Sequence, residues 1–277
     1  MATARASDGT KLHYEVTPSA PLLGRGNDAV LMIQGLGADI SGWAFQRLVF
    51  ATRHRVVALD NRGAGRSAKP AGPYALTQMA DDALAVLDAA GIERAHVVGA
   101  SMGGAIAQIL AIRHPERVAS LVLACTSCRN QAWRRQLLES WMHIAATDGM
   151  HALGRSAMRW LVGPRSLRRF APALGLVGPM LFGAPAAGFV SQCEAILAAP
   201  DSMIDALGSI TAPTLVVVGN QDILTPRGDS EELAERIPGA ELVVIAGAAH
   251  GLMVEHATTF NRVVLDFLAR TRRPALV

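Results

Sequence analysis

The sequence predicts an α/β fold in which a mostly parallel sheet is buried between helices. Apolar runs rich in Val, Leu and Ile recur along the 277 residues, and most are continuous rather than alternating. Such runs are typical of strands buried on both faces. Helical patterns lie between several of them, and this alternation favours parallel pairing. Hydrophobic residues make up 51% of the chain and charged residues 18%, so we expect a substantial core.

The predicted elements follow one another along the chain. Seven short runs are expected to form strands, at residues 12–16, 29–33, 55–59, 95–99, 119–124, 214–219 and 241–245. Apolar residues at helical spacing predict helices after Thr77, after Ser101 and from Phe260 to Phe267. Thr77 is the expected N-cap of the first of these helices, and Gly91 is expected to end it.

A long segment without a convincing strand interrupts this alternation. Residues 127–210 contain three of the four Trp residues and are predicted to form a helical cap, inserted into a core domain of residues 1–126 and 211–277. The segment holds eight Arg residues against five acidic ones. We interpret this excess as a solvated outer face. The alternative is a positive entrance that attracts carboxylate-bearing substrates.

Charge and cysteine content limit the classes of partner. The net charge of +3 is mild, without the clustered Lys and Arg of a nucleic-acid-binding face, so no nucleic acid is expected. Cys125, Cys128 and Cys193 are few and odd in number, which argues against a disulfide framework. The first two have C-x-x-C spacing but lack a second pair for a zinc site. The N-terminus shows no apolar signal segment, so we expect a cytoplasmic protein.

One uncharged stretch has the length of a membrane span. Residues 170–193 carry no charged side chain. Pro172, Pro179, Pro185 and four glycines interrupt the stretch, so a continuous spanning helix is not expected.

Ser101 lies in the sequence Gly99-Ala100-Ser101-Met102-Gly103, which matches the motif G-x-S-x-G. The motif follows a predicted strand and opens a predicted helix, which is the context that a nucleophilic serine of this kind requires. The small neighbours permit a sharp, strained turn, and the helix N-terminus offers free N–H groups to a developing oxyanion. We therefore predict that Ser101 is a nucleophile, rather than part of a turn needed only for packing.

A nucleophilic serine needs a base that is oriented by an acid. His250, on a loop after the last predicted strand, is the expected base, and its rival His256 is expected at the start of the last helix. Asp222 follows the strand at 214–219 and is the expected acid, since the segment after the strand at 119–124 contains no carboxylate. The chain order Ser, Asp, His is the one expected for this kind of fold.

An oxyanion hole requires two N–H donors near the nucleophile. The amide of Met102, directly after the serine, is the first expected donor. Leu36 lies between Gly35 and Gly37 after an early strand, and its amide is the expected second donor, because the glycines let the backbone turn inward. The alternative is a plain glycine turn.

Together these motifs resemble the α/β-hydrolase superfamily over about residues 12–268. The resemblance rests on "QGLG" from Gln34, "DNRGAGRS" from Asp60, "GASMGG" from Gly99, "GNQDILTP" from Gly219 and "GAAHG" from Gly247. It implies a sheet of about eight strands flanked by helices, with a helical cap inserted after the sixth strand. Within the superfamily the chain looks most like the 3-oxoadipate enol-lactonase and carboxylesterase group.

Two of these motifs have particular implications. In the family the segment from Asp60 is a structural turn, and here it lacks the Gly-Lys-Ser/Thr ending of a phosphate-binding loop. Most members have His-Gly where this chain has Gln34-Gly35. Esterase chemistry is expected to survive this difference because the oxyanion donor is a backbone amide, and Gln34 becomes a candidate to bind substrate directly.

The sequence therefore predicts a serine hydrolase that cleaves a carboxylic ester or a lactone through Ser101, Asp222 and His250, with no metal or cofactor. The same triad would also suit hydrolysis of a C–C bond in a ring-fission diketone, or perhydrolysis. A non-catalytic ligand receptor on the same fold is the alternative from another class.

By analogy with the family, the cap is expected to shape an apolar pocket for a medium acyl or aromatic substrate. For each candidate lining residue, packing within the core of the cap is the alternative. The candidates are Gln34, Trp133, Trp141, Met142, Met158, Trp160 and Phe182, with Leu36 and Met102 at the floor.

Overall fold

Eight strands form one sheet in the computed structural model, which describes residues 2–19, 28–170, 182–200 and 202–271. Their order across the sheet is β1-β2-β4-β3-β5-β6-β7-β8. Strand β2 pairs antiparallel with β1 and β4, and the other neighbours are parallel. The strands are β1 (Ala2–Arg5), β2 (Lys11–Thr17), β3 (Ala29–Ile33), β4 (Arg55–Leu59), β5 (Ala95–Ala100), β6 (Val118–Ala124), β7 (Thr214–Gly219) and β8 (Glu241–Ile245).

The mostly parallel sheet is confirmed, and the seven predicted strands agree with the structure to within one residue at each end. Strand β1 was not expected, because its sequence ATAR contains no apolar β-branched run. It forms by antiparallel pairing with β2 after a turn at Gly9, whose φ is +83°.

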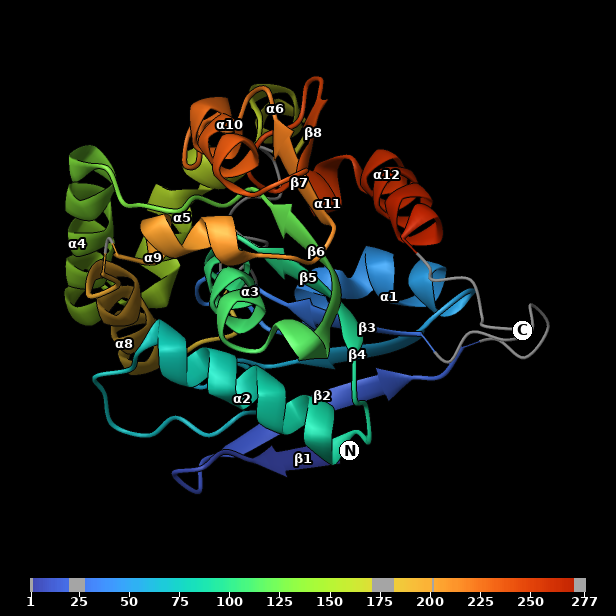
Figure 1. The fold of residues 1–277 in the computed structure, drawn as a ribbon. Coiled ribbons are helices and arrows are strands. Elements are labelled where there is room, and N and C mark those ends of the chain that lie inside the picture. Colours follow the sequence, from blue (N-terminus) through green and yellow to red (C-terminus); the bar gives the residue numbers. More distant parts are fainter. Residues whose placement is uncertain (1, 20–27, 171–181, 201, 272–277) are drawn as a thin grey trace, which may run out of the picture.

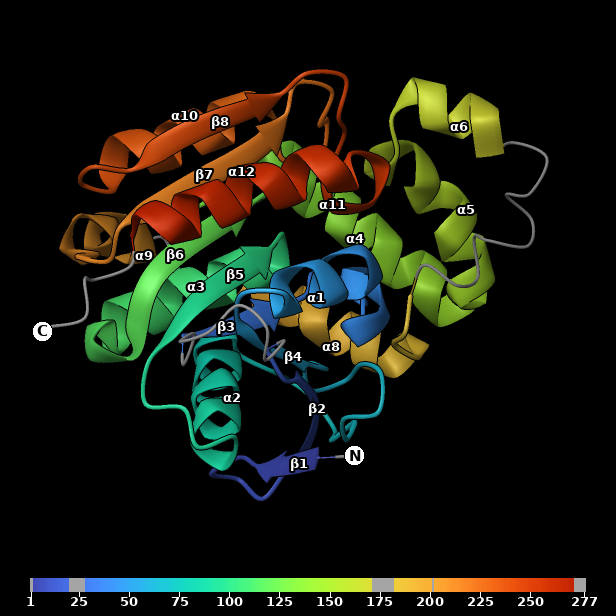
Figure 2. The same cartoon turned by 90° about the vertical axis from the view of Figure 1, so that its right-hand side faces the viewer.

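Helices cover both faces of the sheet (Figures 1 and 2). One face packs against α2 (Leu76–Ala89), α3 (Met102–Arg113) and α10 (Arg227–Arg236). The other packs against α1 (Ala44–Ala51), α11 (Leu252–Glu255) and α12 (Ala257–Arg270). Because α2 begins at Leu76 with Ala75 as its N-cap, the predicted N-cap Thr77 lies inside the first turn.

Among the described residues, five α-helices lie between β6 and β7, which agrees with a helical insertion after the sixth strand. Figure 2 shows α5 and α6 to one side of the sheet rather than over either face. The inserted helices are α4 (Ala132–Thr147), α5 (Gly149–Leu161), α6 (Pro164–Phe170), α8 (Ala186–Leu197) and α9 (Ser202–Ala206).

The continuous apolar strands are explained by burial on both faces. In β3, Leu31 and Ile33 belong to the hydrophobic cluster under α2 and α3, whereas Val30 and Met32 belong to the cluster under α1 and α12. All four side chains are fully buried. Successive strand residues point to opposite faces, so both alternating sets must be apolar.

The glycines around Ser101 let α3 pack closely on the sheet. A Cβ atom at Gly103 would lie 2.2 Å from the carbonyl oxygen of Ile33 in β3, and one at Gly99 would lie 2.3 Å from the carbonyl oxygen of Gly103. Both distances are shorter than any real Cβ contact. Helix α3 therefore begins closer to β3 and β5 than residues with side chains would permit.

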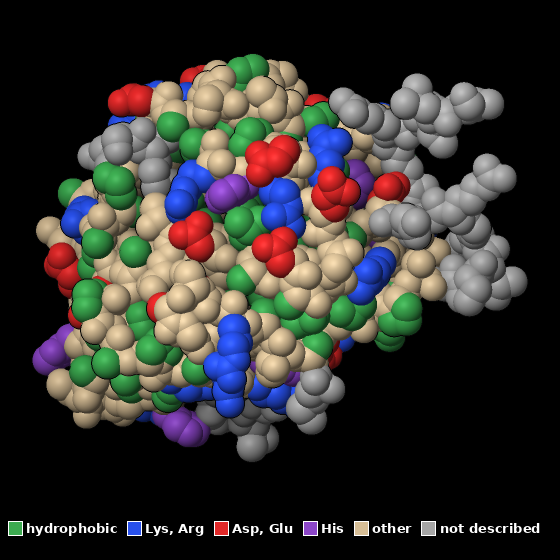
Figure 3. Space-filling model, turned by 60° about the horizontal axis from the view of Figure 1, so that its bottom comes forward, with side chains coloured by type: hydrophobic (Ala, Val, Ile, Leu, Met, Phe, Trp, Pro, Cys, Tyr) green, Lys and Arg blue, Asp and Glu red, His purple; other side chains and the backbone are tan. Residues whose placement is uncertain are grey.

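The surface carries charges of both signs. On the face shown in Figure 3, acidic and basic side chains are interspersed, with hydrophobic side chains between them. The uncharged stretch at 170–193 lies partly on residues 171–181, outside the described residues. Within the described ranges, no helix is both long enough and apolar enough to cross a bilayer.

Gly103→Ala is expected to lower the free energy of unfolding by about 1–3 kcal/mol, because its methyl group would overlap backbone atoms of β3. Gly228→Ala in α10 is the matched control, since nothing lies within 4 Å of that Cβ position. Alanine at 228 is expected to leave stability unchanged or to raise it by up to about 1 kcal/mol. Urea unfolding checks both variants, and equal stability of the two would contradict the packing requirement at Gly103.

Candidate active site

Ser101 occupies a strained turn between β5 and α3. Its backbone has φ 53° and ψ −119°, a conformation that residues other than glycine rarely adopt. The turn is held by the Ser101 N–H, which donates to the carbonyl of Ala124 at 2.9 Å, and by the Thr126 hydroxyl, which donates to the Ser101 carbonyl at 2.7 Å. The strained strand-to-helix turn expected of a G-x-S-x-G serine is therefore present.

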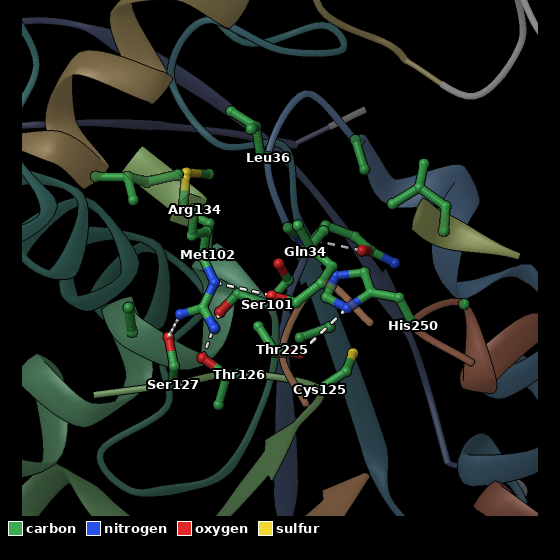
Figure 4. A pocket seen from close by; sticks show the side chains of 18 of the residues that line it. Gln34, Leu36, Ser101, Met102, Cys125, Thr126, Ser127, Arg134, Thr225 and His250 are labelled. Atoms are coloured by element: carbon green, nitrogen blue, oxygen red, sulfur yellow. Dashed lines mark hydrogen bonds between the residues drawn. The ribbon is translucent and has the colours of Figure 1, made fainter. Parts of the chain in front are cut away.

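His250 and Asp222 form a buried hydrogen-bonded pair. The Nδ1 atom of His250 lies 2.9 Å from Oδ2 of Asp222, and the two residues are only 6% and 5% exposed. Figure 4 shows the His250 ring beside Ser101, and both line the same cavity. Among the described residues, Ser101 Oγ makes no hydrogen bond to His250, and such bonds commonly tighten only when substrate binds.

The Asp222 carboxylate is held by its own loop. Its Oδ1 atom accepts hydrogen bonds from the amides of Leu224 and Thr225, each at 2.9 Å. Its Oδ2 atom accepts one from the Thr225 hydroxyl at 2.9 Å, in addition to the bond with His250. The carboxylate is therefore fixed in the orientation that the imidazole needs.

The turn after β3 lies against the serine. A Cβ atom at Gly35 would lie 3.0 Å from the Cβ of Ser101. The Ala38 N–H donates to the Gly35 carbonyl at 3.2 Å, and Gly37 has a φ of +71°, which together form the type II geometry that needs glycine at its third position.

Gln34 supports this turn from within the core. Its Oε1 atom accepts the Gly35 N–H at 3.1 Å, and its carbonyl accepts the Asn61 side-chain amide at 2.9 Å. Gln34 is 5% exposed and also lines the cavity. Its side chain therefore braces the turn, and it lies where substrate can reach it.

Two backbone amides at the cavity are available to an anion. The N–H groups of Leu36 and Met102 have no hydrogen-bond acceptor within the described parts of the chain. Met102 is the first residue of α3, so the positive end of the helix dipole adds to its donor capacity. The arrangement has two N–H donors, as an oxyanion hole requires.

The cavity has a volume of about 650 Å³ and is mostly apolar. Near His250 its wall includes Phe45, Met253 and Val254 from the core. Another part of the wall is formed by α2, α3 and the end of α8, which meet in the hydrophobic cluster that includes Met102. The residues that line this second part are Leu76, Ala105, Ile196, Ala199 and Pro200.

The predicted pocket residues divide into two groups. Gln34, Leu36, Met102, Trp141, Met158 and Phe182 line the cavity. Trp133, Met142 and Trp160 do not, which corrects the expectation for these three. Trp133 and Trp160 stack on each other with ring centroids 5.9 Å apart, and Met142 packs in the hydrophobic cluster of the insertion. His256 also lies outside the cavity lining.

Arg134 of α4 departs from the expected solvated face of arginines, to which exposed residues such as Arg135 and Arg155 conform. It is 3% exposed and pairs with Asp229 of α10. Its Nε–H donates to the Leu224 carbonyl at 2.8 Å, in the loop that holds Asp222, and Figure 4 shows it at the cavity. Burial raises the pKa of Asp229, and the Arg134 charge opposes that shift. No sequence motif indicates that Arg134 pairs with Asp229, because the two residues are 95 positions apart in the chain.

Comparison with known proteins identifies the class. The family described as alpha/beta hydrolase fold matches residues 28–149, and the family described as TAP-like protein matches residues 179–276. The enol-lactonase from Burkholderia xenovorans LB400 superposes with a TM-score of 0.88 at 31% identity, covering 97% of this chain and 100% of that one. The chain belongs to the alpha/beta hydrolase family, and it is a hydrolase.

Two sequence relatives carry more particular names. RutD from Caulobacter vibrioides, a proposed carbamate hydrolase, is 34% identical over 261 residues, which are 93% of this chain and 95% of the relative. The 2-hydroxymuconate semialdehyde hydrolase of a Pseudomonas species is 34% identical over 264 residues, 89% of each chain. Both are similar over nearly the whole length, so the likeness includes the insertion.

The cysteine thiols are expected to react slowly in the native protein. Burial raises the pKa of Cys128 to about 11, with the nearby Glu232 charge adding to the effect. Burial also raises the pKa of Cys125 and Cys193. Iodoacetamide at pH 8 should therefore label the native chain slowly and all three thiols quickly in urea, as mass spectrometry can follow. Rapid labelling of native Cys128 at pH 8, compared with a Cys128→Ser control, would contradict this.

Proposed function

We propose that this hydrolase cleaves a carboxylic ester or a lactone through Ser101, His250 and Asp222. The observation that carries the proposal is a strained serine turn that shares one cavity with a hydrogen-bonded His–Asp pair. A serine at such a turn is typical of the nucleophile in this fold. Likeness to an enol-lactonase over 97% of this chain supports an ester or lactone as the substrate.

In the proposed reaction, Ser101 Oγ attacks the substrate carbonyl while Nε2 of His250 accepts its proton. Asp222 orients the imidazole and stabilises its charged form. The amides of Leu36 and Met102 donate to the oxyanion, and each such donor is typically worth about 10²–10³ in kcat. His250 then protonates the leaving alcohol. A water molecule, deprotonated by His250, hydrolyses the acyl-enzyme and frees Ser101.

The mostly apolar lining of the cavity supports an apolar substrate. In this proposal the acyl group of the substrate is directed away from His250. The leaving oxygen must lie near His250, which gives it a proton. The acyl group then extends past Met102, along the wall formed by Leu76, Ala105 and Ile196. In this proposal the insertion, residues 127–210, acts as the cap that closes the cavity.

Hydrolysis of a C–C bond is the second candidate. The similarity to 2-hydroxymuconate semialdehyde hydrolase favours it, since that relative matches this chain over 89% of its length. Product analysis after incubation with a ring-fission dienoate distinguishes the two reactions. Release of a dienoate acid and a small carboxylic acid, with no turnover of esters, would favour the C–C reaction.

Ser101→Ala is expected to abolish hydrolysis of short p-nitrophenyl esters, because the nucleophile is removed. His256→Ala is the control, since this second histidine lies outside the cavity lining and should keep most of the activity. Release of p-nitrophenol by the two variants and the wild type checks the assignment. Activity retained by the Ser101 variant would overturn it.

Ala105→Leu is expected to shorten the accepted acyl chain, because the larger side chain fills the wall beyond Met102. We expect the ratio of kcat/KM for p-nitrophenyl octanoate to that for acetate to fall about tenfold or more. Phe45→Leu, on the His250 side of the cavity, is the control and should change this ratio little. An unchanged ratio in the Ala105 variant would place the acyl group elsewhere.

A further inference from the structure

The exit segment of the insertion, residues 183–192, is bonded to the turn that carries Leu36. The Ala184 N–H donates to the Gly37 carbonyl at 3.0 Å, and the Gly37 N–H donates to Oε1 of Gln192 at 2.8 Å. Both polar groups of the Gly37 backbone are therefore held by this one segment. Gln192, which lies 155 residues further along the chain than Gly37, thus helps to fix the third residue of the turn.

Gln192 is fully buried in α8 and joins this turn to a second loop. Its Nε2–H donates to the carbonyl of Arg62 at 2.8 Å. The Arg62 guanidinium is held in turn by both carboxylate oxygens of Asp82, each at 2.6 Å, and by Asp8 at 2.9 Å. Gln192 thus links the turn to Arg62, a buried residue whose side chain is held by two ion pairs.

The contact between the exit segment and the core leaves no spare room. A Cβ atom at Gly37 would lie 2.8 Å from the ring of Phe189 in this segment, and 2.7 Å from the ring of Phe182, the residue just before it. A Cβ atom at Gly188 would lie 2.1 Å from the Gly63 carbonyl oxygen. With backbones packed this closely, a shift of α8 would displace the turn as well.

We propose that Gln192 is a positioning residue for the oxyanion hole. It fixes the turn from Gly35 to Ala38, so that the Leu36 N–H faces the substrate. This inference rests on the proposed function, in which that amide is an oxyanion donor. Gln192 does not line the cavity, so it acts through Gly37 rather than on the substrate. Its loss should therefore weaken transition-state stabilisation more than substrate binding.

Gln192→Met keeps the length of the side chain and removes both hydrogen bonds. We expect kcat for p-nitrophenyl acetate to fall about 10- to 100-fold while KM changes less than about threefold. Butylboronic acid, which binds a serine nucleophile as a tetrahedral anion, provides the second measurement. Its inhibition constant should rise by the factor by which kcat falls, because both depend on the oxyanion donors.

Three further variants complete the experiment. Gln192→Glu keeps an acceptor for the Gly37 N–H, so its kcat should recover several-fold relative to Gln192→Met. Ser191→Ala is the matched control: its side chain is also buried in α8 but faces Gly72, and kcat should stay near the wild-type value. Gln192→Asn is too short to reach both partners and serves in place of Gln192→Met if that variant does not fold.

A wild-type kcat in Gln192→Met or Gln192→Asn would overturn the positioning role. So would a loss confined to KM, or a loss of kcat with an unchanged inhibition constant for butylboronic acid. The Ser101→Ala variant separates this inference from the proposed function. Wild-type turnover that does not depend on Ser101 refutes both, whereas Ser101-dependent turnover that survives in Gln192→Met refutes the positioning role alone.

Discussion

The left-handed backbone conformation of Ser101 is the constraint on which the rest of the site depends. Such a conformation costs about 1–3 kcal/mol and persists only where the surrounding structure holds it. Here the bonds to Ala124, the last residue of β6, and to Thr126 in the loop that follows hold it. The absence of side chains at Gly99 and Gly103 lets α3 start directly against the sheet. The same close approach places the amide of Met102 at the cavity.

The remaining groups of the site are arranged around this turn by buried polar contacts. The turn at Gly35 lies against Ser101. The side chains of Gln34 and Asn61 stabilise this turn by hydrogen bonds to its backbone. Both oxygens of the Asp222 carboxylate accept hydrogen bonds, so the acid needs no rearrangement to hold His250. Fixed dipoles of this kind stabilise developing charge without reorganisation during the reaction.

Most of the sheet could be predicted because burial on both faces leaves a continuous apolar pattern. Strand β1 could not, since pairing with β2 rather than its own composition makes it a strand. The residues at the Ser101 turn, and the His250–Asp222 pair, stand at the ends of such strands, where short motifs mark them. Whether these residues catalyse the proposed reaction stays a prediction.

The insertion was less predictable because sequence does not give the rotation of a helix about its axis. In α4 the buried residues Arg134, Leu138, Trp141 and Ala145 form one stripe at helical spacing. Trp133 is next to Arg134 in sequence but points away from this stripe, so composition alone misassigned both residues. Gln192 left no signal either, because its partners Gly37 and Arg62 are more than a hundred residues distant.

The insertion is fastened to the core at both of its ends. Arg134 ties its first helix to Asp229 and to the loop of Asp222, and Gln192 ties its last long helix to Gly37 and Arg62. It is therefore not an interchangeable module. An insertion without side chains equivalent to Arg134 and Gln192 would leave a buried carboxylate and two buried backbone groups of the core without their partners. An exchange of the insertion that changes the substrate pocket must therefore keep these two side chains, or change their core partners with them.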